Sequence, residues 1–200
     1  MLVAKIPQKK SSFEPIGSGT HLARIIWVID LGEQLNKKFN KLQHKVLIAW
    51  ECPKDRIQIN GEDKPRVVSE QYTMSMSPKA NLRLMIEGLL AKTLSDDEAD
   101  NYPLDKLLNQ PCIITTKNSE GSDGKKYTHV AAVAPLMIGM TVDEAETPIF
   151  SFDLDEKDAW KNLDAIPEWI QNIIKKSETY IKLEQADDGF HDINKDELPF

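Results

Sequence analysis

The front two thirds of the chain alternates between short runs of apolar, β-branched residues and polar stretches that contain Gly, Pro, Asn or Ser. Such runs predict strands, because β-branched and aromatic side chains pack well on a pleated surface. Five of them are clear, at residues 20–30, 45–51, 66–76, 112–117 and 127–133. Polar connections join the first two runs and the last two, which predicts two antiparallel hairpins.

The spacing of apolar residues changes between the third and fourth runs. From Pro78 onward, apolar residues recur three and four positions apart, as on one face of a helix. Ser95 to Glu98 has the capping-box pattern of a second short helix. Three strands, a helix and two strands is the order of an OB-type barrel, so we expect a mainly β, five-stranded barrel with a helix inserted between strands three and four. Other small barrels are compatible with the same order.

The last third follows a different pattern. Residues 141–149 are acidic and end in Thr-Pro, which predicts a linker, and 150–154 suits an edge strand or a docked extended segment. Residues 167–176 are predicted to form a short helix, because Pro lies in the first turn, Glu near the start and Lys at the end. Its apolar side must pack on the barrel or on a second copy in a homodimer. We therefore expect a barrel domain at 1–140, a linker with a helix at 141–182, and a disordered acidic tail at 183–200.

Charge is unevenly distributed along the chain, whose net charge is -7. Residues 1–140 carry 19 Lys and Arg against 16 Asp and Glu, whereas residues 141–200 carry 6 against 16. The front is mildly basic and the back strongly acidic, which indicates two parts with different electrostatic roles. An ordinary acidic protein with a solvated tail would show the same imbalance.

Features of other protein classes are missing from the sequence. Two cysteines are too few for a disulfide framework, and the four histidines show no metal-ligand spacing. There is no phosphate-binding glycine loop and no nucleophile elbow, so we expect neither an enzyme nor a cofactor or metal. No apolar run approaches a membrane span, and the first ten residues do not resemble a secretory signal. These features predict a cytoplasmic protein with reduced thiols.

Cations and rings gather in the two hairpin connections. Proteins that bind single-stranded nucleic acid need cations along the phosphates and flat rings on which bases stack. The two connections of an OB fold that carry these residues flank its nucleic-acid face. The first set is Lys37, Lys38, Phe39, Lys41 and Lys45, and the second is Lys117, Lys125, Lys126 and Tyr127. Candidates for the face between them are Arg24, Trp27, Trp50, Arg66 and Tyr72. Both tryptophans lie in apolar strands and suit a core position equally well.

The chain ends in acids followed by an aliphatic residue, a proline and a phenylalanine. These residues are Asp196, Glu197, Leu198, Pro199 and Phe200. The pattern resembles the acidic tip of bacterial single-stranded DNA-binding proteins, which implies that it recruits replication or recombination proteins. A terminal ring can fill a pocket while the acids steer it toward a basic surface.

Two stretches of the front part, His44–Glu51 and Tyr72–Arg83, are similar to phage-encoded single-stranded DNA-binding proteins. The bacterial family has a Gly/Gln/Pro-rich linker, whereas this linker contains a helix, so tetramer formation is not carried over. The sequence predicts sequence-independent binding of single-stranded DNA in phage replication or recombination. A DNA-mimicking inhibitor, a strand-annealing protein and a metal-dependent nuclease are the alternatives.

Overall fold

A computed structural model describes residues 15–37, 39–121 and 124–191. The fold is mainly β, as expected, with helices inserted after the third strand and appended after the last. In chain order the elements are β1 (Gly19–Asn36), β2 (Lys41–Ile59), β3 (Glu62–Thr73), α1 (Asn81–Leu90), α2 (Asp96–Ala99), η1 (Leu104–Leu107), β4 (Pro111–Glu120), β5 (Lys126–Pro135), β6 (Phe150–Phe152), η2 (Ala159–Lys161), α3 (Glu168–Ile174) and α4 (Glu178–His191).

All five predicted strands are present, but the first two are much longer than their apolar runs. Glu33 to Asn36 pairs with Lys41 to His44, so the polar stretch predicted to be a loop is a two-stranded ribbon. Backbone pairing does not require apolar side chains, which is why the apolar pattern underestimated its length. At the other end of β2, Asn60 and Gly61 have φ of 54° and 85° and form the two-residue turn into β3.

The sheet runs in the order β3-β2-β1-β4-β5, with antiparallel neighbours throughout. Strand β4 pairs only with the first part of β1, and the short β6 pairs in parallel with Trp27 to Ile29 farther along. No backbone ladder joins the edge strands β3 and β5 in the described residues. The Glu70 side chain of β3 instead accepts a hydrogen bond from the Val130 N–H of β5, at 3.1 Å.

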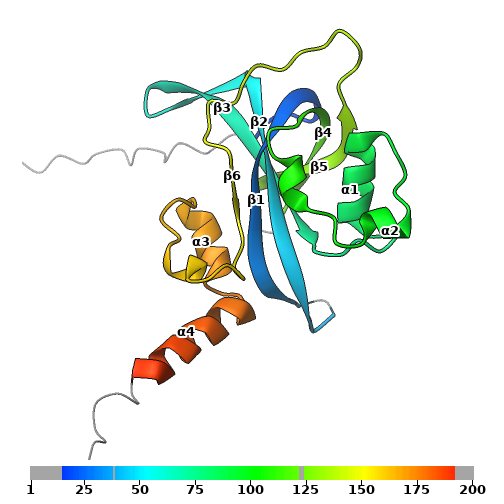
Figure 1. The fold of residues 1–200 in the computed structure, drawn as a ribbon. Helices are drawn as coiled ribbons and strands as arrows, with labels where there is room; N and C mark the ends of the chain where they lie inside the picture. Colours follow the sequence, from blue (N-terminus) through cyan, green and yellow to red (C-terminus); the bar gives the residue numbers. More distant parts are fainter. Residues whose placement is uncertain (1–14, 38, 122–123, 192–200) are drawn as a thin grey trace, which may run out of the picture.

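Strands β1 and β2 are buried on both faces (Figure 1), with α1 and α2 on one side and α3 and α4 on the other. Ile25, Ile48 and Trp50 face the first core with α1. On the opposite face, Ile29 and Leu47 pack against the C-terminal layer. Burial on both faces accounts for the nearly continuous apolar runs in these strands. The residues that the C-terminal layer contributes to this second core are Leu154, Leu163, Ile166, Ile170 and Ile174.

Residues 141–149 are not a free linker, contrary to expectation. The carboxylate of Glu51, fully buried, accepts the backbone N–H groups of Glu146 and Thr147, both at 2.8 Å. The indole N–H of Trp27 donates to the Pro148 carbonyl at 3.0 Å. The acidic side chains suggested a solvated segment, but its backbone groups hold it to the sheet. We call residues 141–149 the strap.

The expected disorder from residue 183 is also wrong over the described residues, because α4 continues to His191. Ser177 is its N-terminal cap and accepts the Tyr180 N–H at 3.0 Å. Thr179 accepts the Glu33 N–H of β1 at 2.9 Å. Gly32 has φ of 68°, and an added Cβ would lie 2.8 Å from the Ser177 hydroxyl oxygen, so glycine allows this close approach.

Replacing Ile170 by Ala tests the packing of α3. Its side chain is fully buried in the second core, so we expect the free energy of unfolding to fall by about 2–5 kcal/mol in urea denaturation. Asn172→Ala changes an exposed residue of the same helix and is the control, with an expected change within about 0.5 kcal/mol. Equal effects of the two substitutions would contradict docking of this helix.

Candidate nucleic-acid interface

The tip of the β1–β2 hairpin projects beyond the rest of the sheet (Figure 1) and carries the first predicted cluster. Lys37 and Lys41 are exposed, and the Phe39 ring is 61% exposed. Leu35 and Leu42 are paired across the ribbon and are also exposed. Lys38 lies outside the described residues. The tip therefore presents an aromatic ring between two cations, with aliphatic side chains directly behind it.

The second predicted cluster lies on the β4–β5 hairpin. Lys117, Lys125, Lys126 and Tyr127 are all exposed there. This hairpin adjoins the start of β1, where Gly19 pairs with Thr116, whereas the first tip follows the end of β1 at Asn36. The two clusters therefore belong to opposite ends of a strand that would span about 55 Å if straight. Register shifts after Ile25 and Asp30 mark irregularities along it.

Two predicted residues lie on the strands between these hairpins. Lys45 of β2 is half-buried, and its ammonium donates to the Thr73 hydroxyl of β3 at 2.7 Å. Burial lowers the pKa of Lys45 from its usual value. Arg66, on β3 opposite Cys52, is also half-buried. Both keep part of their side chain accessible.

Arg24 and both strand tryptophans do not belong to an accessible face. Arg24 is 7% exposed, and its guanidinium donates to the carbonyls of Val142 and Asp143 in the strap, at 3.0 and 3.2 Å. Trp50 is fully buried in the first core and Trp27 is 8% exposed in the second. The expectations that Arg24 contacts phosphates and that Trp50 stacks on bases are therefore wrong. Successive side chains of a strand point to opposite faces of the sheet. Because both faces are covered here, neither orientation leaves these side chains exposed.

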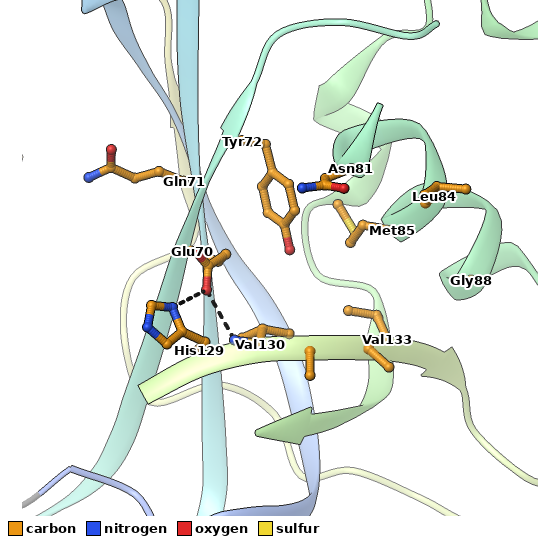
Figure 2. Close-up of a pocket in the computed structure, with 12 residues that line it drawn as sticks. Glu70, Gln71, Tyr72, Asn81, Leu84, Met85, Gly88, His129, Val130 and Val133 are labelled. Atoms are coloured by element: carbon orange, nitrogen blue, oxygen red, sulfur yellow. Dashed lines mark hydrogen bonds and ion pairs between the residues drawn. The ribbon is translucent and has the colours of Figure 1, made fainter. Parts of the chain in front are cut away.

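Tyr72 is buried too, but it lines a cavity of about 540 Å³ between β3, β5 and α1 (Figure 2). Its ring packs in the first core. Glu70, Asn81 and His129 also line this cavity and were not predicted. His129 lies far from Glu70 and Asn81 in the sequence and meets them only because the two edge strands of the sheet approach each other. No local pattern could have indicated them.

A second cavity, of about 530 Å³, is lined by Val28, Val46 and Leu82 of the first core. His44 and Asp30 line it, with 2.6 Å between Nε2 and Oδ1. The hydrogen bond to Asp30 raises the pKa of His44 above 6.5. Five further carboxylates line the cavity, Asp100, Asp105, Asp153, Asp155 and Glu156. Their charge would repel phosphates, so this cavity does not suit a DNA backbone.

Other chemistry is limited in the part of the chain that the structure describes. It holds no group of three or more His, Cys, Asp or Glu side chains placed to bind a metal ion. Burial raises the pKa of both Cys52 and Cys112 to about 12, which keeps the thiols protonated and unreactive. Within the described residues, no helix combines the length and apolar character needed to cross a membrane.

The predicted partner-binding residues, Asp196, Glu197, Leu198, Pro199 and Phe200, lie outside the described residues. Comparison with known proteins finds no matching family model and no matching curated protein. What the chain does must therefore follow from its own residues.

The His44–Asp30 pair makes stability depend on pH. A histidine whose pKa is raised by folding contributes stability fully below its unfolded pKa, and this contribution is lost as pH rises through the folded pKa. We expect the stability advantage of the unmodified protein over His44→Gln to be larger at pH 6 than at pH 8.5. Urea denaturation of both proteins at the two pH values measures this. An advantage equal at both pH values would show that the pair is not charged in the folded protein.

Proposed function

We propose that this chain binds single-stranded DNA largely independently of its sequence and serves phage DNA replication or recombination. The observation that carries the proposal is the exposed Phe39 ring between Lys37 and Lys41 at a projecting hairpin tip. Stacking on such a ring is tolerant of sequence, because every base has a flat face, and cations bind any phosphate. The similarity of His44–Glu51 and Tyr72–Arg83 to phage-encoded proteins supports the biological setting.

An OB-type barrel is the finer architecture that we propose for the β fold. The strand order and the position of α1 between β3 and β4 support it. Contact between β3 and β5 would complete the circuit of five strands, and Glu70 already bridges them through Val130. Its carboxylate also lies 3.3 Å from the ring of His129. In such a barrel, the two hairpins with exposed cations are those used to bind oligonucleotides.

The position of the C-terminal layer narrows the binding surface. It covers the outer face of β1 and β2, where Leu47 and Ala49 are buried against it. Of the cations predicted to contact DNA, those described on the two hairpin tips are exposed and Lys45 is half-buried. We therefore propose that the bound DNA runs from the β1–β2 hairpin tip to the β4–β5 hairpin tip, along the side of the sheet that includes β3.

We further propose that residues 192–200 compete with DNA for these cations and recruit replication or recombination proteins. The segment carries Asp192, Asp196 and Glu197. An acidic segment tethered to a cationic surface has a high effective concentration there. Leu198 and Phe200 would supply apolar contacts to a partner. The acids of the strap have a different role, because Glu146 pairs with Arg56 and Asp143 lies 3.8 Å from Lys54.

Phe39→Ala tests the stacking. We expect it to weaken binding of an oligo-dT strand by about 1–3 kcal/mol, measured by fluorescence anisotropy, because one base loses its ring. Trp169→Ala removes another exposed ring, 49% exposed on α3, and should leave the affinity unchanged. Replacing Lys37 and Lys41 by Ala should lower the slope of log affinity against log salt by about 0.7 for each phosphate that is no longer neutralised. Full affinity in Phe39→Ala and in the double lysine variant would contradict the proposed site.

Removing residues 192–200 tests the competition. The deletion leaves α4 intact, and we expect tighter binding to oligo-dT, with a larger gain at low salt than at high salt. A chain of full length with Asp192→Asn, Asp196→Asn and Glu197→Gln is the control for length and should show most of the same gain. If neither protein differs from the unmodified chain, the segment does not compete with DNA.

A further inference from the structure

The cavity at the seam between β3 and β5 has the features of a ligand site. Figure 2 shows the Tyr72 ring directed into the space between α1 and β5, with Glu70 below it and Asn81 beside it. Its volume of about 540 Å³ is within the range of cavities that hold small organic groups. Such a cavity has room for a nucleobase.

The hydroxyl of Tyr72 is a polar group that a ligand in the cavity can reach. The residue is only 6% exposed, and its ring packs in the first core. None of the residues that the structure describes forms a hydrogen bond with its hydroxyl group, which faces the cavity. The hydroxyl oxygen is not one of the buried polar atoms that lack a partner, so it is accessible from the cavity, where it can donate one hydrogen bond and accept another from a ligand.

The cavity is closed by packing at one end and by a polar bridge at the other. An added Cβ on Gly88 would lie 2.6 Å from the Val133 carbonyl oxygen, so α1 rests directly on β5 there. At the other end Glu70 spans from β3 to Val130. Leu84, Met85 and Val133 supply apolar lining between the two ends. A flat group with an apolar face and a polar edge suits this arrangement.

Cations lie on both sides of the seam. Thr73 follows Tyr72 and therefore points to the other face of β3, where its hydroxyl accepts a hydrogen bond from the ammonium group of Lys45. On the other side, Lys117 of β4 is the register partner of His129, which lines the cavity. A DNA strand whose phosphates contact these two lysines would pass over the seam between β3 and β5, where one of its bases can turn inward.

We infer that this cavity takes one base of the bound strand, and that it prefers a base that carries an exocyclic amino group. The inference rests on the proposed function. The carboxylate of Glu70 can only accept hydrogen bonds, and Tyr72 can accept one as well. Cytosine, adenine and guanine offer an amino group, whereas thymine presents carbonyl oxygens on both sides of its single N–H. The carbonyl oxygens of thymine would be repelled by the carboxylate of Glu70, because both groups are hydrogen-bond acceptors.

Two oligonucleotides that differ by one group test the preference. One is a 15-mer of dT, and the other carries a single central 5-methyl-dC, which exchanges the 4-carbonyl for an amino group, turns N3 from a donor into an acceptor, and keeps the methyl. We expect the full-length protein to bind the second about 2- to 10-fold more tightly, as one additional hydrogen bond implies. Tyr72→Phe keeps the ring and should lose this preference while binding the dT strand within about twofold of the unmodified protein.

Controls separate this inference from the proposed function. Tyr180→Phe removes a hydroxyl from α4, in the C-terminal layer on the opposite side of the sheet, and should keep the preference for 5-methyl-dC. Thermal unfolding of each variant checks that the fold is intact. Binding of both oligonucleotides with equal affinity, or a preference that persists in Tyr72→Phe, overturns the base cavity and leaves the proposed function standing. Failure of the unmodified protein to bind either strand overturns the proposed function itself.

Discussion

Burial of the β1–β2 hairpin on both faces determines how the other elements of the fold are arranged. An ordinary antiparallel hairpin hides one face and leaves the other to solvent, but here Ile48 and Leu47, successive residues of β2, are both fully enclosed. The inner face needs α1, and the outer face needs the layer of α3 and the residues before it. The C-terminal third is therefore part of the folded unit, and removing it would expose a large apolar surface.

Two buried charges fix how that layer is attached. Arg24 and Glu51 are adjacent in the ladder of β1 and β2, and each bonds to backbone groups of the strap. A buried charge is tolerated when hydrogen bonds surround it, and here the strap supplies them. The same attachment removes Arg24 from any role with DNA. Of the cations predicted to contact DNA, those described at the hairpin tips remain exposed.

The sequence predicted the positions of the strands and helices better than it predicted which side chains of the strands are exposed. Apolar runs located all five strands, and the capping box at Ser95 and Glu98 is present as expected. The exposed positions of Phe39, Lys37 and Lys41 follow from their place in a polar connection. Trp50 could not be assigned, because a run buried on both faces shows no alternation from which a side could be inferred.

Interactions between segments that are distant in the sequence account for the remaining differences between the predicted and the observed structure. The strap looked like a linker because its side chains are acidic, but its backbone groups, which no composition reveals, hold it in place. The cavity under Tyr72 combines residues of β3 and α1 with residues of β5, which lie more than fifty positions beyond β3 in the sequence. Two polar residues of its lining, Glu70 and His129, meet only because the two edge strands of the sheet lie side by side.

Binding of unpaired DNA by the hairpin tips is best tested by titrating the full-length protein with a labelled dT strand and with a duplex of the same length, at low and high salt. We predict tight binding of the single strand at low salt, weaker binding of the duplex, and a loss of affinity as salt rises, because ion release from the phosphates contributes to binding. Equal binding of both forms, or no binding of the single strand at low salt, would contradict this prediction.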